Sequence, residues 1–201
     1  MTPPEFILAS GSSSRRTMLA AAGVDFTAIA PEVDEDEVRA KMPPKMAGDG
    51  RAVAEHLAEC KALAVSARHP DALVLGCDQV LLCDGKVFNK AMDAREADAT
   101  LRALRGRSHQ LISAAVIAKE KDLIWRCTDV ARLEMHEFSD AFLARYLQAE
   151  LPDILGSVGC YRIEGRGAQL FARVDGDQFT IRGLPLIPLL AALRAQQALL
   201  S

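Results

Sequence analysis

The sequence lacks the charge surplus that marks proteins of long nucleic acids. In 201 residues, 24 Lys and Arg stand against 27 Asp and Glu, a formal net charge of −3. Proteins that bind long DNA or RNA normally carry a basic surplus, so the composition argues against that class of partner. A small anionic ligand stays compatible with it, because such a ligand needs only a few well-placed cations.

Cysteine pairs and long apolar runs are also absent. The five cysteines include no Cys-x-x-Cys pair, which argues against a disulfide framework or a cysteine zinc site. The first five residues have neither a basic start nor an apolar core, so we expect no signal peptide. No run approaches the ~20 apolar residues of a membrane span. We therefore expect a cytoplasmic protein with reduced thiols and no membrane partner.

What the sequence does contain is an alternation of strand and helix patterns. Half of the residues are hydrophobic, which is enough to bury the core of a single domain over residues 1–201. Predicted strands cover residues 6–9, 26–30, 72–76, 80–83, 86–88, 111–118 and 123–133, with a strand pair around Asp175-Gly176. Predicted helices cover residues 14–22, 51–68, 94–105, 139–147 and a final segment after 186. Residues 34–50 are expected to form an acidic cluster and a loop. This interleaving predicts an α/β fold.

A serine-rich turn followed by two arginines is the first candidate binding site. Ser10 to Ser14 follow the strand at 6–9, and Arg15 and Arg16 fall in the first turn of the next helix. Free backbone N–H groups at a helix start favour an anion, and arginine matches phosphate oxygens. Cations oppose the helix dipole there, so an anionic ligand would explain them. A capped helix with solvated arginines is the alternative. The turn fits neither the P-loop nor the Rossmann pattern.

Four other charged residues are weaker candidates when each is taken alone. Asp78 follows the apolar run at 72–76, where it could hold a metal or accept a proton from water. Alternatively, its carboxylate could simply accept a hydrogen bond from the backbone of its own turn. Lys61 and Lys90 could approach a phosphate, although such lysines are more often solvated. Glu35 could bind a metal, although acidic loops usually only face water. The four histidines have no metal-ligand spacing, and we expect them to be structural.

Taken in order, these segments resemble the Maf family of nucleoside triphosphate pyrophosphatases. The run Leu8-Ala-Ser-Gly-Ser-Ser-Ser-Arg-Arg-Thr-Met-Leu19 is similar to the family's opening L-A-S-x-S-P-x-R-R-x-x-L. The other matching segments are Asp34-Glu35, Lys61, Leu75 to Val80, Asp84-Gly85 through Lys90, Gly159 to Gly165, Gly176-Asp177 and Gly183 to Leu186.

The resemblance implies a fold, a reaction and a set of roles. The fold would be the two-lobed Maf-like (ITPase-like) one, with a long curved mixed sheet flanked by helices and a central cleft. The reaction would split a nucleoside triphosphate between its α- and β-phosphates with Mg²⁺ or Mn²⁺. Asp78 would take the proton from water, and Glu35 and Asp78 would hold the metal. The residues implied to hold the triphosphate are Ser10, Ser12, Arg15, Arg16, Lys61 and Lys90. A homodimer is also compatible with the resemblance.

Three further positions bear on which nucleotide is used. In the family that the chain resembles, members that act on UTP and dTTP have Arg, Thr and Gln at the positions where this chain has Ser14, Gln79 and Glu164. Gln79 and Glu164 are similar to the branch that acts on 7-methyl-GTP, which often has an aromatic residue at the Ser14 position. A Glu can accept two hydrogen bonds from guanine. We therefore expect a 7-methyl-GTP pyrophosphatase. The alternatives are a UTP/dTTP pyrophosphatase, a non-catalytic protein of cell division (septum formation), or a sugar-phosphate phosphatase.

Overall fold

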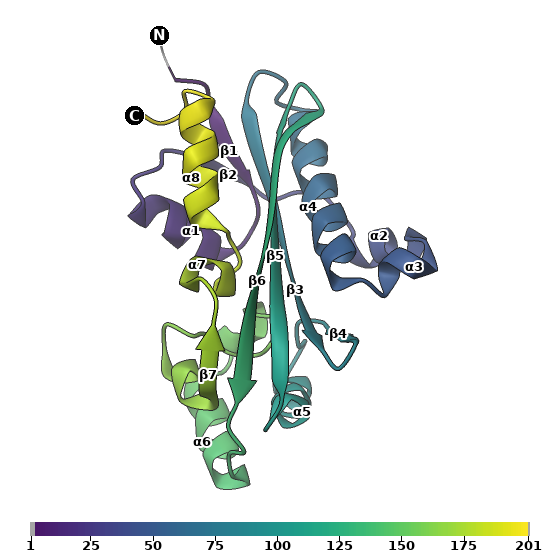
Figure 1. Ribbon diagram of the computed structural model, residues 1–201, viewed down its shortest axis with the longest axis vertical. Helices are drawn as coiled ribbons and strands as arrows, with labels where there is room; N and C mark the ends of the chain where they lie inside the picture. The colour runs from purple at the N-terminus through teal and green to yellow at the C-terminus, as the bar shows by residue number, and fades with distance from the viewer. Residues whose placement is uncertain (1–2, 201) are drawn as a thin grey trace.

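The apolar segments assemble into one mixed sheet in the computed structural model, which describes residues 3–200 (Figure 1). Residues 1, 2 and 201 of the expected domain lie outside the described residues. The strands are β1 Phe6–Ala9, β2 Thr27–Ile29, β3 Leu73–Cys83, β4 Lys86–Phe88, β5 Ser108–Lys119, β6 Asp122–Met135 and β7 Phe171–Asp175. Their order is β2-β1-β3-β5-β6-β7, with β4 also paired to β3. β1 is parallel to β2 and β3, and the other pairs are antiparallel.

Helices follow most strands, and polar caps begin many of them. They are α1 Ser13–Ala21, α2 Glu35–Lys41, α3 Pro44–Ala47, α4 Gly50–Ser66, α5 Ala94–Leu104, α6 Asp140–Glu150, α7 Gln178–Ile181 and α8 Leu186–Ala195, with 3₁₀ turns η1 Asp153–Gly156 and η2 Arg166–Leu170. Ser12, Asp49 and Ser139 each accept a backbone N–H from the first turn of the helix that follows. Such caps satisfy N–H groups that have no partner within the helix. Among the described residues, no helix has both the length and the apolar character needed to span a membrane.

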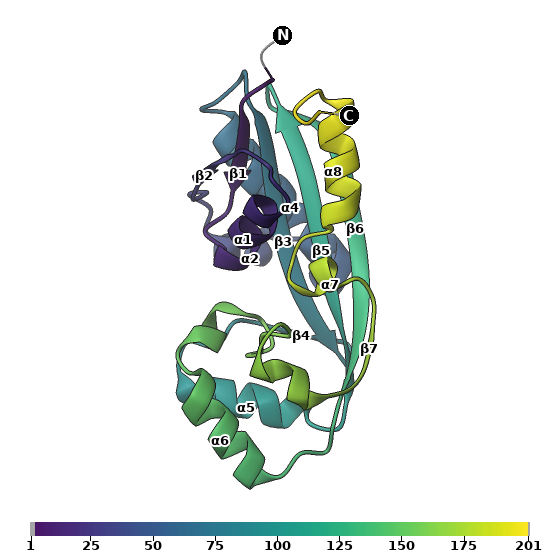
Figure 2. The same cartoon turned by 90° about the vertical axis from the view of Figure 1, so that its left-hand side faces the viewer.

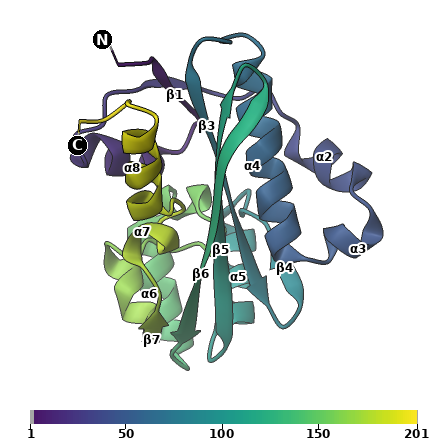
Figure 3. The same cartoon turned by 45° about the horizontal axis from the view of Figure 1, so that its top comes forward.

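Two helices cover opposite faces of the long strands. α4 packs on one face through residues such as Leu57 and Ala62, against Val80 and Ile112 of the sheet. α8, together with α1, covers the other face in a separate apolar cluster. Figure 3 shows α4 and α8 on either side of β3, β5 and β6. The predicted mixed sheet flanked by helices is thus confirmed.

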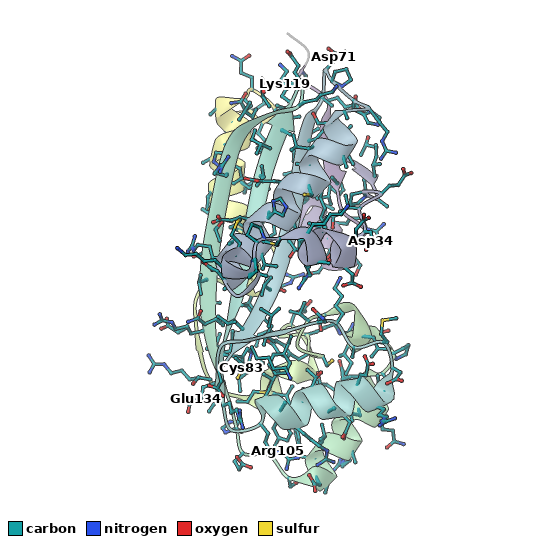
Figure 4. The ribbon with its side chains drawn as sticks, turned by 90° about the vertical axis from the view of Figure 1, so that its right-hand side faces the viewer. Asp34, Asp71, Cys83, Arg105, Lys119 and Glu134 are labelled. Carbon is teal, nitrogen blue, oxygen red and sulfur yellow. The ribbon has the colours of Figure 1, made fainter. Side chains whose placement is uncertain are left out.

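Helices α5 and α6 lie at the other end of the strands (Figure 2). We call β1, β2, α1, α4 and α8 the upper end, and β4, α5, α6 and β7 the lower end. Figure 2 shows these two groups, with β3, β5 and β6 running between them. In Figure 4, Asp71 and Lys119 mark the upper tip of the strands and Arg105 lies at the lower end. A third apolar cluster fills the lower end and includes Leu101, Leu143 and Tyr161.

Three predictions about local structure are wrong. Residues 34–50 are not a loop: Asp34 caps α2, and Glu35, Asp36 and Glu37 suit its first turn, where the helix dipole favours acids. α3 follows, with a proline in its first turn. The expected strand pair around Asp175-Gly176 is one strand, β7, because Asp177 caps α7 directly afterwards.

The third error concerns the strand that carries Asp78. We expected one strand to end at Gly76 and another to begin at Val80, but β3 runs without a break from Leu73 to Cys83. Cys77 and Val80 are buried, and the charge of Asp78 is met by a lysine from α4, so the polar residue does not interrupt the strand. The Asp84-Gly85 turn that follows has positive φ at both residues, as a type I′ hairpin requires.

Candidate active site

The candidate site lies where one edge of β3 has no strand beside it. β1 pairs with β3 as far as Gly76, and β4 pairs with it only from Leu81 onward. β5 occupies the opposite edge throughout this stretch. Residues 77–80 therefore keep one free edge, between an upper strand and a lower one. Asp78 and Gln79, both predicted site residues, lie in this interval.

Close packing of α4 on β3 brings Lys61 to Asp78. A Cβ on Gly76 would collide with the backbone of Ala58 and Ala62, so only glycine allows this approach. Lys61 Nζ donates to Asp78 Oδ1 at 2.6 Å, and both side chains are more than nine-tenths buried. Lys61 Nζ also lies 2.7 Å from Glu35 Oε1. Lys61 of α4 thus holds one carboxylate from β3 and one from α2.

The second carboxylate oxygen of Asp78 has no partner. Asp78 Oδ2 is buried and accepts no hydrogen bond within residues 3–200. Leaving a charged acceptor unpaired is costly, so such an atom marks a place for a ligand or a water. Burial raises the pKa of Asp78 above its ordinary value, although the charges of Lys61 and Arg15 act against this. A raised pKa makes the carboxylate a better proton acceptor.

Glu35 and Lys90 complete a cluster of alternating charge. Burial raises the pKa of Glu35, but Lys61, Lys90 and Arg39 outweigh it, and the net pKa lies below the ordinary value. The pKa of Lys90 is lowered by burial and by the cations Arg15 and Lys61, while Glu35 and Asp78 oppose this. Lys90 follows β4 of the lower end, so both ends of the molecule supply charge to one place.

Arg15 is buried and bound entirely by neutral oxygens in its side-chain hydrogen bonds. Its Nε donates to Gly183 O at 2.8 Å, and its Nη1 donates to Ser10 Oγ at 3.2 Å and Cys77 O at 3.1 Å. The Cys77 carbonyl lies just beyond the last β1 pair. Arg15 therefore joins the first turn of the chain to its C-terminal part. No carboxylate balances it in these contacts, so its charge is available to an anion.

The two serines and Arg16 differ in their contributions. Ser10 Oγ accepts from Ser12 N as well as from Arg15, and Ser12 Oγ caps α1 by accepting from Arg15 N. The serine turn is thus organised around Arg15. Arg16 is exposed on α1, and the contacts of the cluster do not include it.

The three residues predicted to select the base all contact the segment 180–182, although they are far apart in sequence. Ser14 Oγ donates to Arg182 O at 3.2 Å. Gln79 Nε2 lies 3.0 Å from Thr180 O, from Ile181 O and from Ser113 Oγ. Glu164 Oε1 lies 3.5 Å from Arg182 Nε. Sequence reasoning missed Ser113 of β5, Thr180 of α7 and Arg182 directly after it, because a single polar residue in a strand or a short helix carries no signal of its own.

The comparisons with known proteins show which family the chain belongs to. The chain matches the model of the Maf-like protein family over residues 5–196. It belongs to the Maf family. A relative from Granulibacter bethesdensis, named nucleoside triphosphate pyrophosphatase, is 48% identical over 195 residues, which is 97% of this chain and 98% of the relative. A relative from Mesorhizobium japonicum, named 7-methyl-GTP pyrophosphatase, is 46% identical over 195 residues, with the same coverage of each chain.

The carboxylates of this Maf-family site fit a metal ion that is also bound by water and by substrate phosphates. Within residues 3–200, no group of three or more His, Cys, Asp or Glu side chains could hold an ion by itself. Glu35 and the unpaired Asp78 Oδ2 offer two carboxylates around Lys61. Mg²⁺ is commonly bound by one or two carboxylates together with substrate phosphates and water. The residues present therefore suit a metal that arrives with a phosphate.

A cavity on the lower part of the sheet is separate from this site. This cavity of about 410 Å³ is lined by residues that include Asp84, Gln110, Arg132 and Arg173, but by none of the predicted site residues. Glu134, labelled in Figure 4, lines this cavity, and Cys83, also labelled, lies between the lining residues Leu82 and Asp84 in sequence. The cavity is lined by both acidic and basic side chains of the lower part of the sheet. Among the described residues that line it, no carboxylate is both buried and without a hydrogen bond. We therefore keep the Asp78 cluster as the candidate site.

Proposed function

We propose that this Maf-family protein hydrolyses nucleoside triphosphates between the α- and β-phosphates, releasing a nucleoside monophosphate and pyrophosphate. The observation that carries the proposal is Asp78, which is buried, held at Oδ1 by Lys61 and unpaired at Oδ2. The names of relatives that are 46–48% identical support the same reaction class. The domain extends over residues 1–201, with the charged cluster between the two ends.

The proposal gives each residue of the cluster a role. Lys61 orients Asp78 so that Oδ2 is the free oxygen, and Oδ2 takes the proton from the attacking water. Arg15, Lys61 and Lys90 bind the phosphate oxygens, Ser10 and Ser12 hold the turn that places Arg15, and Arg16 meets the outer phosphates from the exposed side of α1. Transfer at phosphorus depends mainly on positioning and charge stabilisation, which this set supplies. A bound Mg²⁺ or Mn²⁺, held by Glu35 and Asp78, would neutralise phosphate oxygens.

A guanine base with a 7-methyl group is the preferred substrate in this proposal. Thr180 O and Ile181 O only accept, so Gln79 must turn its amide nitrogen to them and its Oε1 away from them. Gln79 Oε1 and the Glu164 carboxylate then offer acceptors to the N1–H and N2–H₂ donors of guanine. Relatives named 7-methyl-GTP pyrophosphatase, from Mesorhizobium japonicum and Brucella abortus, are 46% and 40% identical. A uracil edge has a single N–H donor, so a UTP-type substrate would use this set less fully.

Asp78→Asn tests the reaction. With 7-methyl-GTP, GTP, UTP and dTTP and Mg²⁺, we expect the unmodified protein to release pyrophosphate and the variant to lose about 100-fold or more in rate. Asp84→Asn is the matched control, because it makes the same change at an exposed turn residue, and its rate should be unchanged. No pyrophosphate from any triphosphate, or an undiminished rate in Asp78→Asn, would overturn the proposal.

Other products would favour the alternatives. Orthophosphate in place of pyrophosphate would indicate a phosphatase. A cell-division partner that binds Asp78→Asn as well as the unmodified protein, without hydrolysis, would indicate a non-catalytic role. Homodimerisation remains a prediction that light scattering can test.

A further inference from the structure

We propose that Arg182 determines how strongly this site discriminates between a methylated and an unmethylated guanine base. The inference rests on the proposed function and adds a residue to it. Arg182 would pair with Glu164 and cancel most of its charge. The site would then gain less from the positive charge of a 7-methylguanine ring. Arg182 would therefore reduce the preference for 7-methyl-GTP over GTP below what Glu164 alone would give.

The position of Arg182 places it among the three residues that face the base. It directly follows α7, and its backbone carbonyl accepts from Ser14 Oγ at 3.2 Å. The two residues before it, Thr180 and Ile181, accept from Gln79. Its side chain reaches Glu164, with Nε 3.5 Å from Oε1. One short segment thus contacts Ser14, Gln79 and Glu164.

The contact between Arg182 and Glu164 is an attraction of charges without an aligned hydrogen bond. Arg182 Nε is buried and has no hydrogen-bond partner among the described residues, even though Glu164 Oε1 is near. The side chains are 20% and 42% exposed, so water screens the pair only in part. A buried donor without a partner calls for an explanation. In this proposal the guanidinium acts on Glu164 through its charge.

The other nearby arginine does not play this part. Arg162 adds to the charge around Glu164, but its own ion pairs are with Glu150, at 3.0 Å, and Asp153, at 3.3 Å. Glu164 is the carboxylate that Arg182 pairs with in residues 3–200. Removing Arg182 therefore changes the net charge at the base side with little compensation from its neighbours.

The electrostatic consequence has a definite sign. A lone carboxylate attracts the cationic 7-methylguanine ring more than neutral guanine. A guanidinium beside that carboxylate repels the cationic ring and leaves the hydrogen-bond acceptors of Glu164 in place. Substituting Arg182 by a neutral residue should then increase the preference for 7-methyl-GTP over GTP, through KM and not through kcat.

The test is the ratio of kcat/KM for 7-methyl-GTP to that for GTP. We expect Arg182→Gln to raise this ratio about tenfold, which corresponds to about 1.4 kcal/mol. Arg182→Lys keeps the charge and should keep the ratio. Arg166→Gln, at an exposed arginine 3.9 Å from Glu150, is the matched surface control and should also leave it unchanged. An unchanged ratio in Arg182→Gln, or an equal rise in Arg182→Lys, would overturn the inference.

A double-mutant cycle with Glu164→Gln provides a second measurement. If Arg182 acts through Glu164, Arg182→Gln should not change the ratio in the Glu164→Gln background. An equal change in both backgrounds would overturn the inference. Calorimetric binding of 7-methyl-GMP and GMP gives the same ratio without turnover, so the inference can fail or hold separately from hydrolysis. Binding of neither product to the unmodified protein would overturn it, whereas pyrophosphate release by that protein tests the proposed function alone.

Discussion

Two polar pairs are buried against the same long strands, one toward the upper end and one at the lower end, but they treat charge in opposite ways. At the middle of β3, Asp78 forms an ion pair at 2.6 Å with Lys61 of α4. At the lower end, on β5, His109 Nε2 lies 2.7 Å from the Tyr161 hydroxyl. Burial lowers the pKa of His109 to about 4, so this pair is neutral at pH 7. A sheet therefore tolerates buried polar groups either as balanced charges or as uncharged partners.

The surroundings of each pair explain the difference. Tyr161 and Phe171 pack edge to face at 4.9 Å, and His109 lies 5.7 and 6.1 Å from their ring centroids. This aromatic setting offers His109 no counter-ion, and burial without a counter-ion disfavours its charged form. Asp78 instead meets Lys61, Arg15 and Lys90, which stabilise a carboxylate. Both pairs leave one nitrogen or oxygen without a hydrogen bond, His109 Nδ1 and Asp78 Oδ2, but only Asp78 stands among cations. The lower pair is thus suited to packing and the upper one to chemistry.

The largest expected effect comes from breaking the charged pair. Lys61→Met leaves Asp78 buried without its cation, which should lower the free energy of unfolding by about 3–5 kcal/mol at pH 7 and abolish hydrolysis. Urea unfolding measures the first effect and pyrophosphate release the second. Lys45→Met, at an exposed position of α3, is the control and should change neither. A Lys61→Met protein as stable as the unmodified one would show that Asp78 does not depend on its partner.

The next largest expected effect is a pH dependence of the free energy of unfolding, which arises from His109 at the lower end. The pKa of His109 is about 4 in the folded chain against an ordinary 6.5, so the unfolded chain binds more protons between these values. Stability should therefore be fully present above pH 6.5 and fall by about 3 kcal/mol as the pH drops to about 4. His109→Gln should remove this component. Unfolding curves of both proteins across this range measure the difference, and parallel curves would contradict the assignment.

The smallest expected effect separates stability from activity. Tyr161→Phe removes the hydroxyl near His109 Nε2 and leaves a second buried ring nitrogen unpaired, at a cost of about 1–3 kcal/mol. We expect kcat/KM at 25 °C to stay unchanged, because Tyr161 lies in the lower cluster and its hydrogen bonds are with His109 and Ser157. Thermal unfolding and pyrophosphate release on one preparation test both statements. A loss of activity without a loss of stability would show that the two ends are coupled.

Some parts of the fold and the site could be predicted from local sequence. The hairpin of β3 and β4 follows from Asp84-Gly85, and helix α6 begins where Ser139 caps it. The positions of Lys61 and Asp78 followed from motif order. The extent of β3 beyond Gly76 could not be predicted, because a carboxylate in a strand is stable there only when α4 supplies its cation. The contact between Arg182 and Glu164 has no local signal, since the two residues meet only through folding.

By itself the sequence determined the alternation of strands and helices, the absence of a basic surplus and the order of the charged motifs. These depend on periodicity, caps and composition, which are properties of short stretches. Only the tertiary structure decided that Lys61 joins Glu35 to Asp78, that Arg15 is held by neutral oxygens, and that Arg182 lies against Glu164. Such contacts depend on how α4 approaches β3 at Gly76 and on where β1 stops pairing, and distances of a few ångströms between remote segments are set by packing.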